Sequence, residues 1–311
     1  MSEFYHVSVL LDECIEGLNI KPNGIYVDGT LGGAGHSSQI AKRLITGRLI
    51  GIDRDPVALK AASERLAPYM DRVTLVHSNF CEIKTVLQEL NIPGVDGILL
   101  DLGVSSPQLD DAQRGFSYMA DAPLDMRMNS GDALSAYTVV NTWSQEELKR
   151  ILYDYGEERY APQIASAICR RRNDKPIETT LELVNVIRSA MPAAALREKQ
   201  HPAKRSFQAI RIAVNDELGS VEQVMRDAIP CLNPGGRLAI ITFHSLEDRI
   251  VKNGMTNASK GCTCPPNFPV CVCGKKPQVK LISRKPIISG DEELERNPRA
   301  RSAKLRVCEK I

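Results

Sequence analysis

The stretch from Ile25 to Ile40 constrains the fold of this 311-residue chain more than any other part of it. It reads I-Y-V-D-G-T-L-G-G-A-G-H-S-S-Q-I, an apolar run that ends in Asp28, then glycines, then the polar start of a helical pattern. This order is typical of a strand, a tight turn and a helix N-terminus. Gly32, Gly33 and Gly35 carry no Cβ, so the backbone there can approach a ligand closely. The unpaired amides at the start of the helix would face that ligand, which we expect to be nucleotide-like.

The alternation of strand and helix continues through the first third of the chain. Helical patterns at 56–69 and 83–90 separate predicted strands at 48–53, 72–77 and 94–102. This alternation is typical of an α/β protein with a doubly wound parallel sheet. A fifth strand is predicted at 237–243, and two C-terminal strands, 279–285 and 302–309, are expected to close the edge of the sheet as a hairpin.

The middle of the chain shows loop signals and then helical periodicity, with no convincing strand. We therefore expect a helical insertion within a sheet domain. The predicted parts are 1–105 (first part of the sheet domain), 106–210 (helical insertion) and 211–311 (second part, with the closing hairpin).

The composition excludes several classes of protein. The apolar content is 43% and no run approaches the roughly 18–20 apolar residues needed to cross a bilayer, so no membrane association is expected. The N-terminus lacks the pattern of a secretory signal, and the nine cysteines are an odd number. We therefore expect a cytoplasmic protein with mostly reduced thiols.

The net charge of +2 says little about partners, but its distribution says more. Residues 252–285 carry seven Lys/Arg and no acid, residues 296–310 carry six Lys/Arg and one acid, and Arg170–Arg172 form a third cluster. Each cluster alone is compatible with ordinary solvated surface. Three clusters of one sign in a nearly neutral chain favour a polyanionic partner.

Polar or glycine-rich loops follow four predicted strands, and ligands of open α/β sheets bind at such strand ends. Asp53 is placed to accept from ribose hydroxyls, Phe80 could face an adenine, and Asp101 would lie near the reacting end. A dinucleotide fingerprint would need glycine where Ser38 stands. Asp28 would repel a pyrophosphate but suits a cation. These residues favour S-adenosylmethionine, whose methionine end Asp28 could meet.

Later motifs make the assignment more specific. They are D-L-G-V-S-S-P-Q-L-D-D at 101–111, R-G-F-S-Y at 114–118, P-L-D-M-R-M at 123–128, H-P-A-K-R-S-F-Q-A-I-R at 201–211, F-H-S-L-E-D-R at 243–249 and N-P-R-A-R at 297–301. With the glycine stretch, they make the whole chain resemble the MraW/RsmH family of ribosomal RNA methyltransferases.

The resemblance implies a seven-stranded class I methyltransferase (Rossmann-like) sheet and transfer of a methyl group from S-adenosylmethionine. The expected target is the exocyclic N4 of one decoding-centre cytosine in 16S ribosomal RNA of the small subunit or its precursor. No obligate protein partner is implied. By motif position, the cofactor contacts would be Ala34, Gly35, His36, Asp53, Phe80, Asp101 and Gln108.

Methylation of a cytosine amino group needs a positioned acceptor for its hydrogen, because the nitrogen lone pair is delocalised into the ring. Asp101 is the expected carboxylate, and Ser105 and Ser106 are expected to hold the base. Among substrate-binding candidates, Arg205 and Arg211 would contact phosphates. Asp125 and His244 are equally compatible with substrate contacts and with structural hydrogen bonding.

Two other functions remain open from the sequence. One is a DNA cytosine-N4 methyltransferase, which shares the chemistry. The other is a non-catalytic RNA-binding factor for ribosome assembly that keeps the cofactor fold as a scaffold.

Four cysteines also remain open. Cys262, Cys264, Cys271 and Cys273 flank a proline-rich loop and either bind zinc or belong to a reduced, flexible loop, since C-x-C pairs are tighter than the usual C-x2-C knuckle. No metal is expected in the active site, because methyl transfer to an amine needs none.

Overall fold

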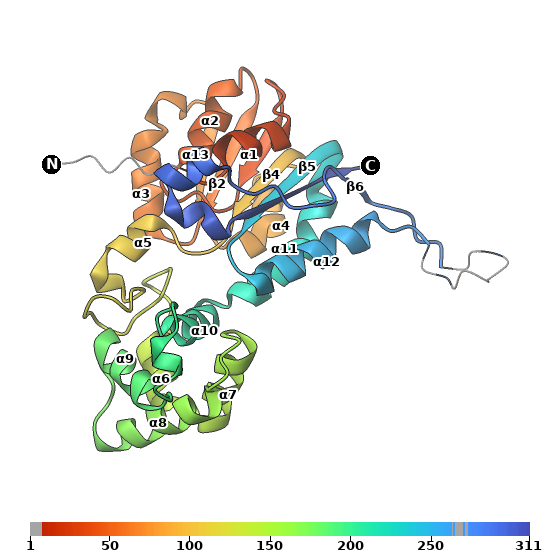
Figure 1. Cartoon of the computed structure of the whole chain (residues 1–311). Coiled ribbons are helices and arrows are strands. Elements are labelled where there is room, and N and C mark those ends of the chain that lie inside the picture. Colours follow the sequence, from red (N-terminus) through yellow and green to blue (C-terminus); the bar gives the residue numbers. More distant parts are fainter. Residues whose placement is uncertain (1–7, 263, 265–269, 271–272) are drawn as a thin grey trace. The chain divides into compact units, whose positions relative to one another are not determined.

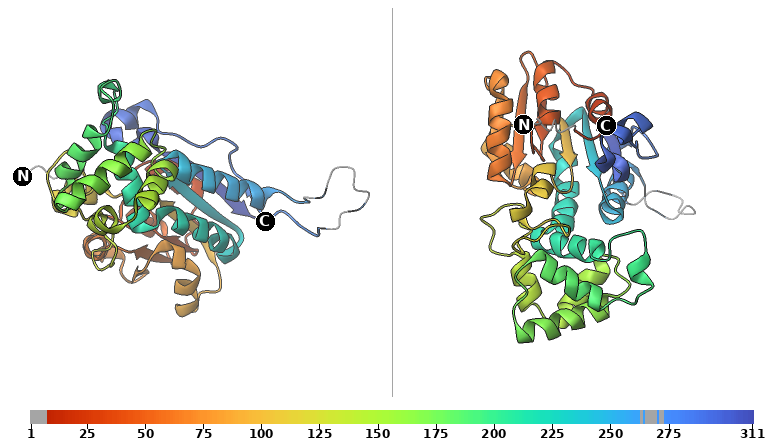
Figure 2. Two further views of the ribbon diagram at one scale, coloured as in Figure 1. Left: turned by 90° about the horizontal axis from the view of Figure 1, so that it is seen from below. Right: turned by 60° about the vertical axis from the view of Figure 1, so that its left-hand side comes forward.

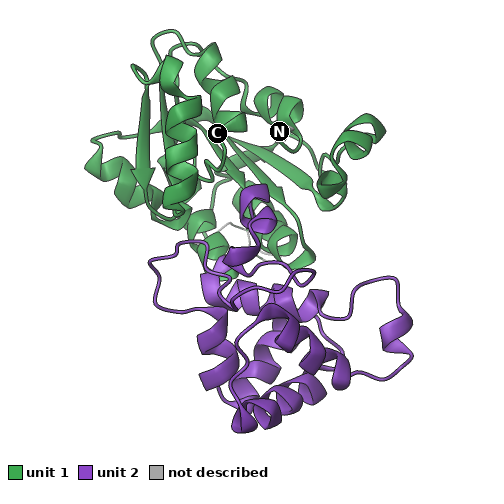
Figure 3. Cartoon of the chain, turned by 90° about the vertical axis from the view of Figure 1, so that its left-hand side faces the viewer, with its two compact units in different colours: residues 1–103, 218–311 green, residues 104–217 purple. Residues whose placement is uncertain are grey.

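The computed structural model describes residues 8–262, 264, 270 and 273–311. It divides into two compact units (Figure 3). The sheet unit comprises Met1–Gly103 and Leu218–Ile311, and the helical unit comprises Val104–Glu217. The expected boundaries were at 105 and 210, so the helical unit extends seven residues further than expected at its C-terminal side.

A seven-stranded sheet forms the sheet unit, in the order β3-β2-β1-β4-β5-β7-β6 (Figure 1). The five parallel strands are β1 (Ile25–Asp28), β2 (Arg48–Asp53), β3 (Val73–His77), β4 (Val95–Asp101) and β5 (Leu232–Thr242). Two antiparallel strands, β6 (Val279–Leu281) and β7 (Lys304–Lys310), close the sheet beyond β5. The predicted doubly wound sheet is thus confirmed. Strand order reverses between β1 and β4, which is where ligands of such sheets bind.

Helices cover both faces of the sheet (Figures 1 and 2). The helices of one face are α1 (Leu11–Leu18), α2 (Gly35–Arg43), α3 (Pro56–Arg65) and α13 (Asp291–Arg296). Those of the other are α4 (Ile83–Glu89), α11 (Glu217–Cys231) and α12 (Ser245–Ser259).

Alternation along the strands supplies a core to each face. In β2, Leu49 belongs to the α1–α3 side, whereas Ile50 and Ile52 belong to the α4–α12 side. In β4, Leu99 and Leu100 divide in the same way. Each such fully buried side chain contributes about 1.5–3 kcal/mol, so both layers hold the strands in register.

Helix α12 is the main element that the sequence analysis did not predict. Its N-terminus is fixed by a capping box in which the His244 side chain accepts from the amide of Glu247. Val251 and Met255 then turn one face of the helix into the core. The strand limits also differ, since β5 begins at Leu232 and β6 ends at Leu281.

The helical unit packs six helices around its own core. They are α5 (Ser106–Asp110), α6 (Ala136–Thr142), α7 (Gln145–Asp154), α8 (Ala161–Asp174), α9 (Thr180–Ser189) and α10 (Lys204–Asn215). Capping boxes at Ser144–Glu147 and Thr179–Glu182 start α7 and α9. Short 3-10 helices occur in this unit at Ala112–Arg114 and Ala195–Arg197, and in the sheet unit at Ala67–Tyr69, Phe80–Glu82 and Pro298–Ser302.

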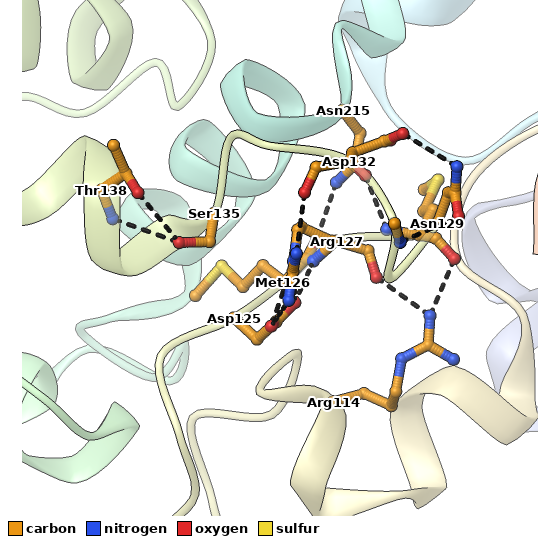
Figure 4. Close-up of polar contacts among 11 residues, drawn as sticks. Arg114, Asp125, Met126, Arg127, Asn129, Asp132, Ser135, Thr138 and Asn215 are labelled. Carbon is orange, nitrogen blue, oxygen red and sulfur yellow. Dashed lines mark hydrogen bonds and ion pairs between the residues drawn. The ribbon is translucent and has the colours of Figure 1, made fainter.

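A buried amide holds the irregular segment before α6 (Figure 4). Asn215 is 2% exposed; its Oδ1 accepts from the amide of Met128 at 2.7 Å. Its Nδ2 donates to the carbonyls of Met126 at 2.8 Å and Arg211 at 2.9 Å. One side chain therefore ties the loop to the last turn of α10.

No helix within the described ranges is long and apolar enough to span a lipid bilayer.

We expect Asn215→Ala to destabilise the helical unit by about 2–4 kcal/mol, because it leaves buried backbone groups without partners. Urea unfolding followed by the fluorescence of Trp143, the single tryptophan, reports on this unit. The exposed Asn253→Ala should change stability by less than about 0.5 kcal/mol. Equal unfolding midpoints for the two variants would contradict this account.

Candidate active site

Three acidic residues end parallel strands at one edge of the sheet. Asp28 ends β1, Asp53 ends β2 and Asp101 ends β4. Because β1 and β4 flank the point where strand order reverses, the loops that follow them border the expected ligand crevice.

The last residue of β2, Asp53, holds the glycine loop that follows β1. Asp53 Oδ2 accepts from the amide of Gly32 at 2.7 Å, and Asp53 Oδ1 accepts from the amide of Asp55 at 2.8 Å. The loop adopts left-handed backbone at Gly32 (φ 48°) and at Ala34 (φ 57°). Left-handed backbone costs an alanine about 1 kcal/mol or more. The hydrogen bonds and packing around the loop must offset that cost to keep Ala34 in this conformation.

Asp28 braces the loop rather than facing the crevice. It is 2% exposed; its Oδ2 accepts from Ser37 Oγ at 2.7 Å and its Oδ1 from the amide of Thr30 at 3.2 Å. Burial raises the pKa of Asp28 to about 6. Both carboxylate oxygens of Asp28 thus bond groups of the loop itself, and direct contact with a cationic ligand stays a prediction.

The glycines serve different purposes. A Cβ on Gly33 would meet nothing within 4 Å, so its backbone faces open space. A Cβ on Gly35 would lie 1.8 Å from Ser8 Oγ. Gly35 is therefore required by the packing of the N-terminal segment onto the first residue of α2, whatever its backbone does toward a ligand.

Asp101 carries the carboxylate with the fewest partners. Its amide donates to Thr30 Oγ1 at 2.6 Å, which fixes the end of β4 against the glycine loop. Its Oδ1 is buried and has no hydrogen-bond partner among the residues that the structure describes. Burial, reinforced by the negative charges of Asp28 and Glu247, raises the pKa of Asp101 to about 8.

His36 lies between the N-terminal segment and Asp101. Its Nε2 is 3.0 Å from the carbonyl of Val9, and its Nδ1 is 3.9 Å from Asp101 Oδ2. A carbonyl only accepts, so a neutral ring carries its proton on Nε2 and presents Nδ1 as an acceptor toward Asp101. This tautomer suits the protonated form of Asp101.

Phe80 begins the 3-10 turn after β3 and packs against the strand ends. A Cβ built on Gly29 would lie 3.0 Å from Phe80 Cβ, so the Phe80 side chain begins next to the first residue of the glycine loop. Asn79 caps this turn by accepting from the amide of Cys81 at 3.2 Å.

Six of the expected cofactor residues thus belong to the sheet unit, around the ends of β1, β2, β3 and β4. They are Ala34, Gly35, His36, Asp53, Phe80 and Asp101. Gln108 belongs to the helical unit, where it forms a capping box at the start of α5: Gln108 Oε1 accepts from the amide of Ser105 at 3.1 Å. Ser105 is the N-cap of α5, and Ser106 is its first residue.

The expected substrate residues have partners within their own units. Asp125 forms an ion pair with Arg127, whose Nη2 lies 2.6 Å from Asp125 Oδ2 (Figure 4). Burial alone would raise the pKa of Asp125, but the hydrogen bonds and charge of Arg127 bring it below its usual value. His244 caps α12, and its Nε2 lies 3.1 Å from Glu247 Oε1.

The two candidate arginines on α10 differ. Arg211 makes paired 2.8 Å bonds to the buried carboxylate of Glu217 and is 20% exposed. Arg205 donates to the carbonyl of Glu157 at 3.3 Å and lines a shallow surface hollow together with Arg159 and His201. Arg205 is the better placed of the two to reach a phosphate.

Several residues that position the site were missed by sequence reasoning. Thr30 and Ser37 bond Asp101 and Asp28, and Val9 bonds His36. The hydroxyls within D-G-T and H-S-S could have been assigned as loop ligands, since such residues bond nearby backbone and carboxylates. Nothing in the sequence pattern indicates the role of Val9, whose carbonyl acts through tertiary contact.

The sheet order, the glycine loop and the acids at its carboxyl edge define a class I methyltransferase. The family model of the MraW methylase family matches residues 3–311, so the chain belongs to that family.

Two relatives are similar over almost the whole chain. Both are named "Ribosomal RNA small subunit methyltransferase H". The protein from Brevibacillus brevis is 61% identical over 309 residues (99% of this chain, 98% of the relative). That from Clostridium botulinum (strain Kyoto) is 60% identical over 310 residues (99% and 100%). A solved rRNA methylase from Streptococcus thermophilus aligns over 98% of both chains at 11% identity and a TM-score of 0.40. The family assignment rests on the family model and the two relatives.

The methyl donor of this methyltransferase is S-adenosylmethionine. The site fits that ligand, because a positively charged group stabilises the ionised forms of Asp28 and Asp101, whose pKa values are raised without it. The open face of Gly33 and the uncapped start of α2 leave backbone available to its polar groups.

The raised pKa of Asp101 predicts a pH-dependent stability. In the ligand-free protein, the folded state keeps this proton between the ordinary pKa of 3.8 and about 8, whereas the unfolded state releases it. The carboxyl group therefore lowers stability progressively as pH rises through that window. We expect Asp101→Asn to gain melting temperature relative to the parent protein between about pH 5.5 and 8.5.

Differential scanning fluorimetry of the ligand-free variants measures this. Asp71→Asn is the control, because Asp71 is exposed and its hydrogen bond with Arg72 lowers its pKa. Its difference from the parent protein should stay constant over this range. A constant difference for Asp101→Asn as well would contradict the assigned protonation.

Proposed function

We propose that this enzyme transfers the methyl group of S-adenosylmethionine to the exocyclic N4 of one decoding-centre cytosine in 16S ribosomal RNA. Membership of the MraW methylase family and the printed names of the relatives support a ribosomal RNA substrate. The observation that carries the chemistry is the half-buried carboxylate of Asp101, whose Oδ1 is buried and lacks any hydrogen-bond partner within the described part of the chain.

The cytosine amino group is a poor nucleophile, because its lone pair is shared with the ring. When bound, S-adenosylmethionine supplies a methyl group activated by a positively charged sulfur. Asp101 then accepts a hydrogen bond from the amino group, which turns the nitrogen lone pair out of the ring plane and offsets the positive charge that develops there. In its ionised form, Asp101 is also placed to take the proton that the amino group releases.

His36 and Thr30 position that carboxylate. Thr30 fixes the backbone of Asp101, and His36 limits where Oδ2 can turn. The pKa of Asp101 falls when positive charge arrives, so its ionised form is the one present in the loaded site.

The remaining cofactor roles follow from position. The backbone of Ala34, Gly35 and His36 would bind the amino-acid end of the ligand. Asp53 would accept from ribose hydroxyls with the lone pairs that its loop bonds leave over. Phe80 would cover the adenine, and Gln108 is the further cofactor position that the family motif implies.

The RNA-binding roles fall to the helical unit. The target base must leave its stack, and Ser105 and Ser106 would hold it. Arg205 would bind phosphate at its surface hollow. The internal partners of Arg211, Asp125 and His244 favour positioning roles for these three residues.

We expect Asp53→Ala to weaken binding of S-adenosylmethionine about 10- to 100-fold, because it removes a charged acceptor and loosens the glycine loop, together about 1.5–3 kcal/mol. Isothermal titration calorimetry measures the dissociation constant. Asp53→Asn keeps one acceptor and should give an intermediate value. Asp71→Ala is the control and should bind as the parent protein does; equal affinities for all four proteins would contradict the role of Asp53.

We expect the purified enzyme to label small-subunit particles or 16S RNA from labelled S-adenosylmethionine at one cytosine, mapped as N4-methylcytidine by nucleoside mass spectrometry. Asp101→Asn should lower kcat about 10²- to 10⁴-fold while RNA binding persists, since it removes the proton acceptor.

Labelling of DNA instead of RNA would favour a DNA methyltransferase. Unchanged RNA modification in cells that carry Asp101→Asn in place of the parent protein would favour a non-catalytic assembly factor. Either result would overturn the proposed function.

A further inference from the structure

Three cysteine thiols converge away from the strand ends that form the active site. Cys262, Cys264 and Cys273 belong to the segment between α12 and β6 (Figure 1). Their three Sγ atoms all lie within 4.8 Å of one another, and those of Cys262 and Cys273 are 3.7 Å apart.

The separation of Cys262 and Cys273 matches a shared metal ion. Zinc–thiolate bonds of about 2.3 Å at tetrahedral angles place two sulfur ligands about 3.8 Å apart. A disulfide would need about 2.05 Å between the two sulfurs. The observed 3.7 Å excludes a disulfide and matches the spacing that two sulfur ligands of one zinc ion would need.

The backbone around the thiols supports the same arrangement. The amide of Cys264 donates to Cys262 Sγ at 3.4 Å, a contact that stabilises the thiolate form that a metal requires. Gly274 has a φ of 61°, so the chain turns directly after Cys273 in a conformation that favours glycine.

The donor chemistry selects the metal. Residues 249–290 contain no Asp, Glu or His, so thiols are the metal-binding side chains available in this segment. Soft thiolates favour zinc over magnesium or calcium, which require oxygen ligands. Three thiolates and Zn²⁺ leave a net negative charge, which Lys260, Lys275 and Lys276 can offset.

We propose that Cys262, Cys264 and Cys273 bind one structural Zn²⁺ ion. Each thiol gives up its proton to solvent as its sulfur binds the metal. Cys271, the fourth cysteine of the sequence motif, lies outside the described residues.

The ion would close a segment whose base is already anchored. The amide of Gln278 donates to the carbonyl of Ala258 at 2.8 Å, and the amide of Ile311 donates to the carbonyl of Gln278 at 3.0 Å. These bonds join the end of α12 to β6 and the C-terminus. Zinc would fix the basic residues beyond that base, independently of methyl transfer.

Metal analysis of the full-length protein, desalted without chelator under reducing conditions, tests the proposal. We expect about one equivalent of zinc per chain in the parent protein and in Cys169→Ser, whose thiol is on α8. Cys262→Ser, Cys264→Ser and Cys273→Ser should each lose most of the zinc. Cys271→Ser losing it equally would identify the fourth ligand, and zinc retained there would identify solvent.

Co²⁺ titration and limited trypsin digestion give readouts that do not depend on activity. Co²⁺ should produce the visible spectrum of a tetrahedral thiolate site, abolished in Cys273→Ser. Removing zinc should speed cleavage after Lys260 and Lys275 in the parent protein but not further in Cys273→Ser. Zinc below about 0.1 equivalent together with no cobalt spectrum, or a disulfide joining Cys262 and Cys273 in the reduced protein, would overturn the proposal.

Discussion

The partial or full removal of three carboxylates from water at one edge of a parallel sheet is the constraint on which the site depends. Asp28, Asp53 and Asp101 end neighbouring strands, and burial raises the pKa of each. Asp28 and Asp53 offset that cost with hydrogen bonds that fix the glycine loop, whereas Asp101 keeps an oxygen without a hydrogen-bond partner in the described part of the chain. The same acids thus build the loop and favour a cationic ligand beside it.

Residues 8–10 and helix α13 contact each other, and residues 8–9 contact α2 next to that edge of the sheet. Glu293 on α13 accepts from the amide of Leu10 at 2.7 Å, which holds the start of α1. The residues just before it contact α2, since Ser8 packs on Gly35 and the carbonyl of Val9 bonds His36. The orientation of His36 toward Asp101 therefore depends on segments almost 300 residues apart in the sequence.

Positive charge in this protein has two uses that the sequence does not separate. Arg172, from one of the three basic clusters, donates to the carbonyls of Val140 at 2.7 Å and Trp143 at 2.6 Å and so ends α6. Arg306, from another, bonds Asp248 at 2.7 Å, and Lys310 bonds the carbonyls at the end of α11. These cations stabilise the fold, which leaves the exposed Arg170 and the half-buried Arg205 as the better candidates for RNA.

The sequence by itself determined the strand–loop–helix unit at Ile25–Ile40, the parallel sheet, the helical insertion and the family, because periodicity and glycine placement are local and the motifs are specific. It missed α12, whose start depends on the His244–Glu247 capping box. Only the tertiary structure decided which acids brace the loop and which one has spare acceptor capacity. It also decided that Gly35 makes room for Ser8 and that Arg211 donates hydrogen bonds to Glu217. Burial and partner choice arise from distant segments brought together, and residue order alone does not fix them.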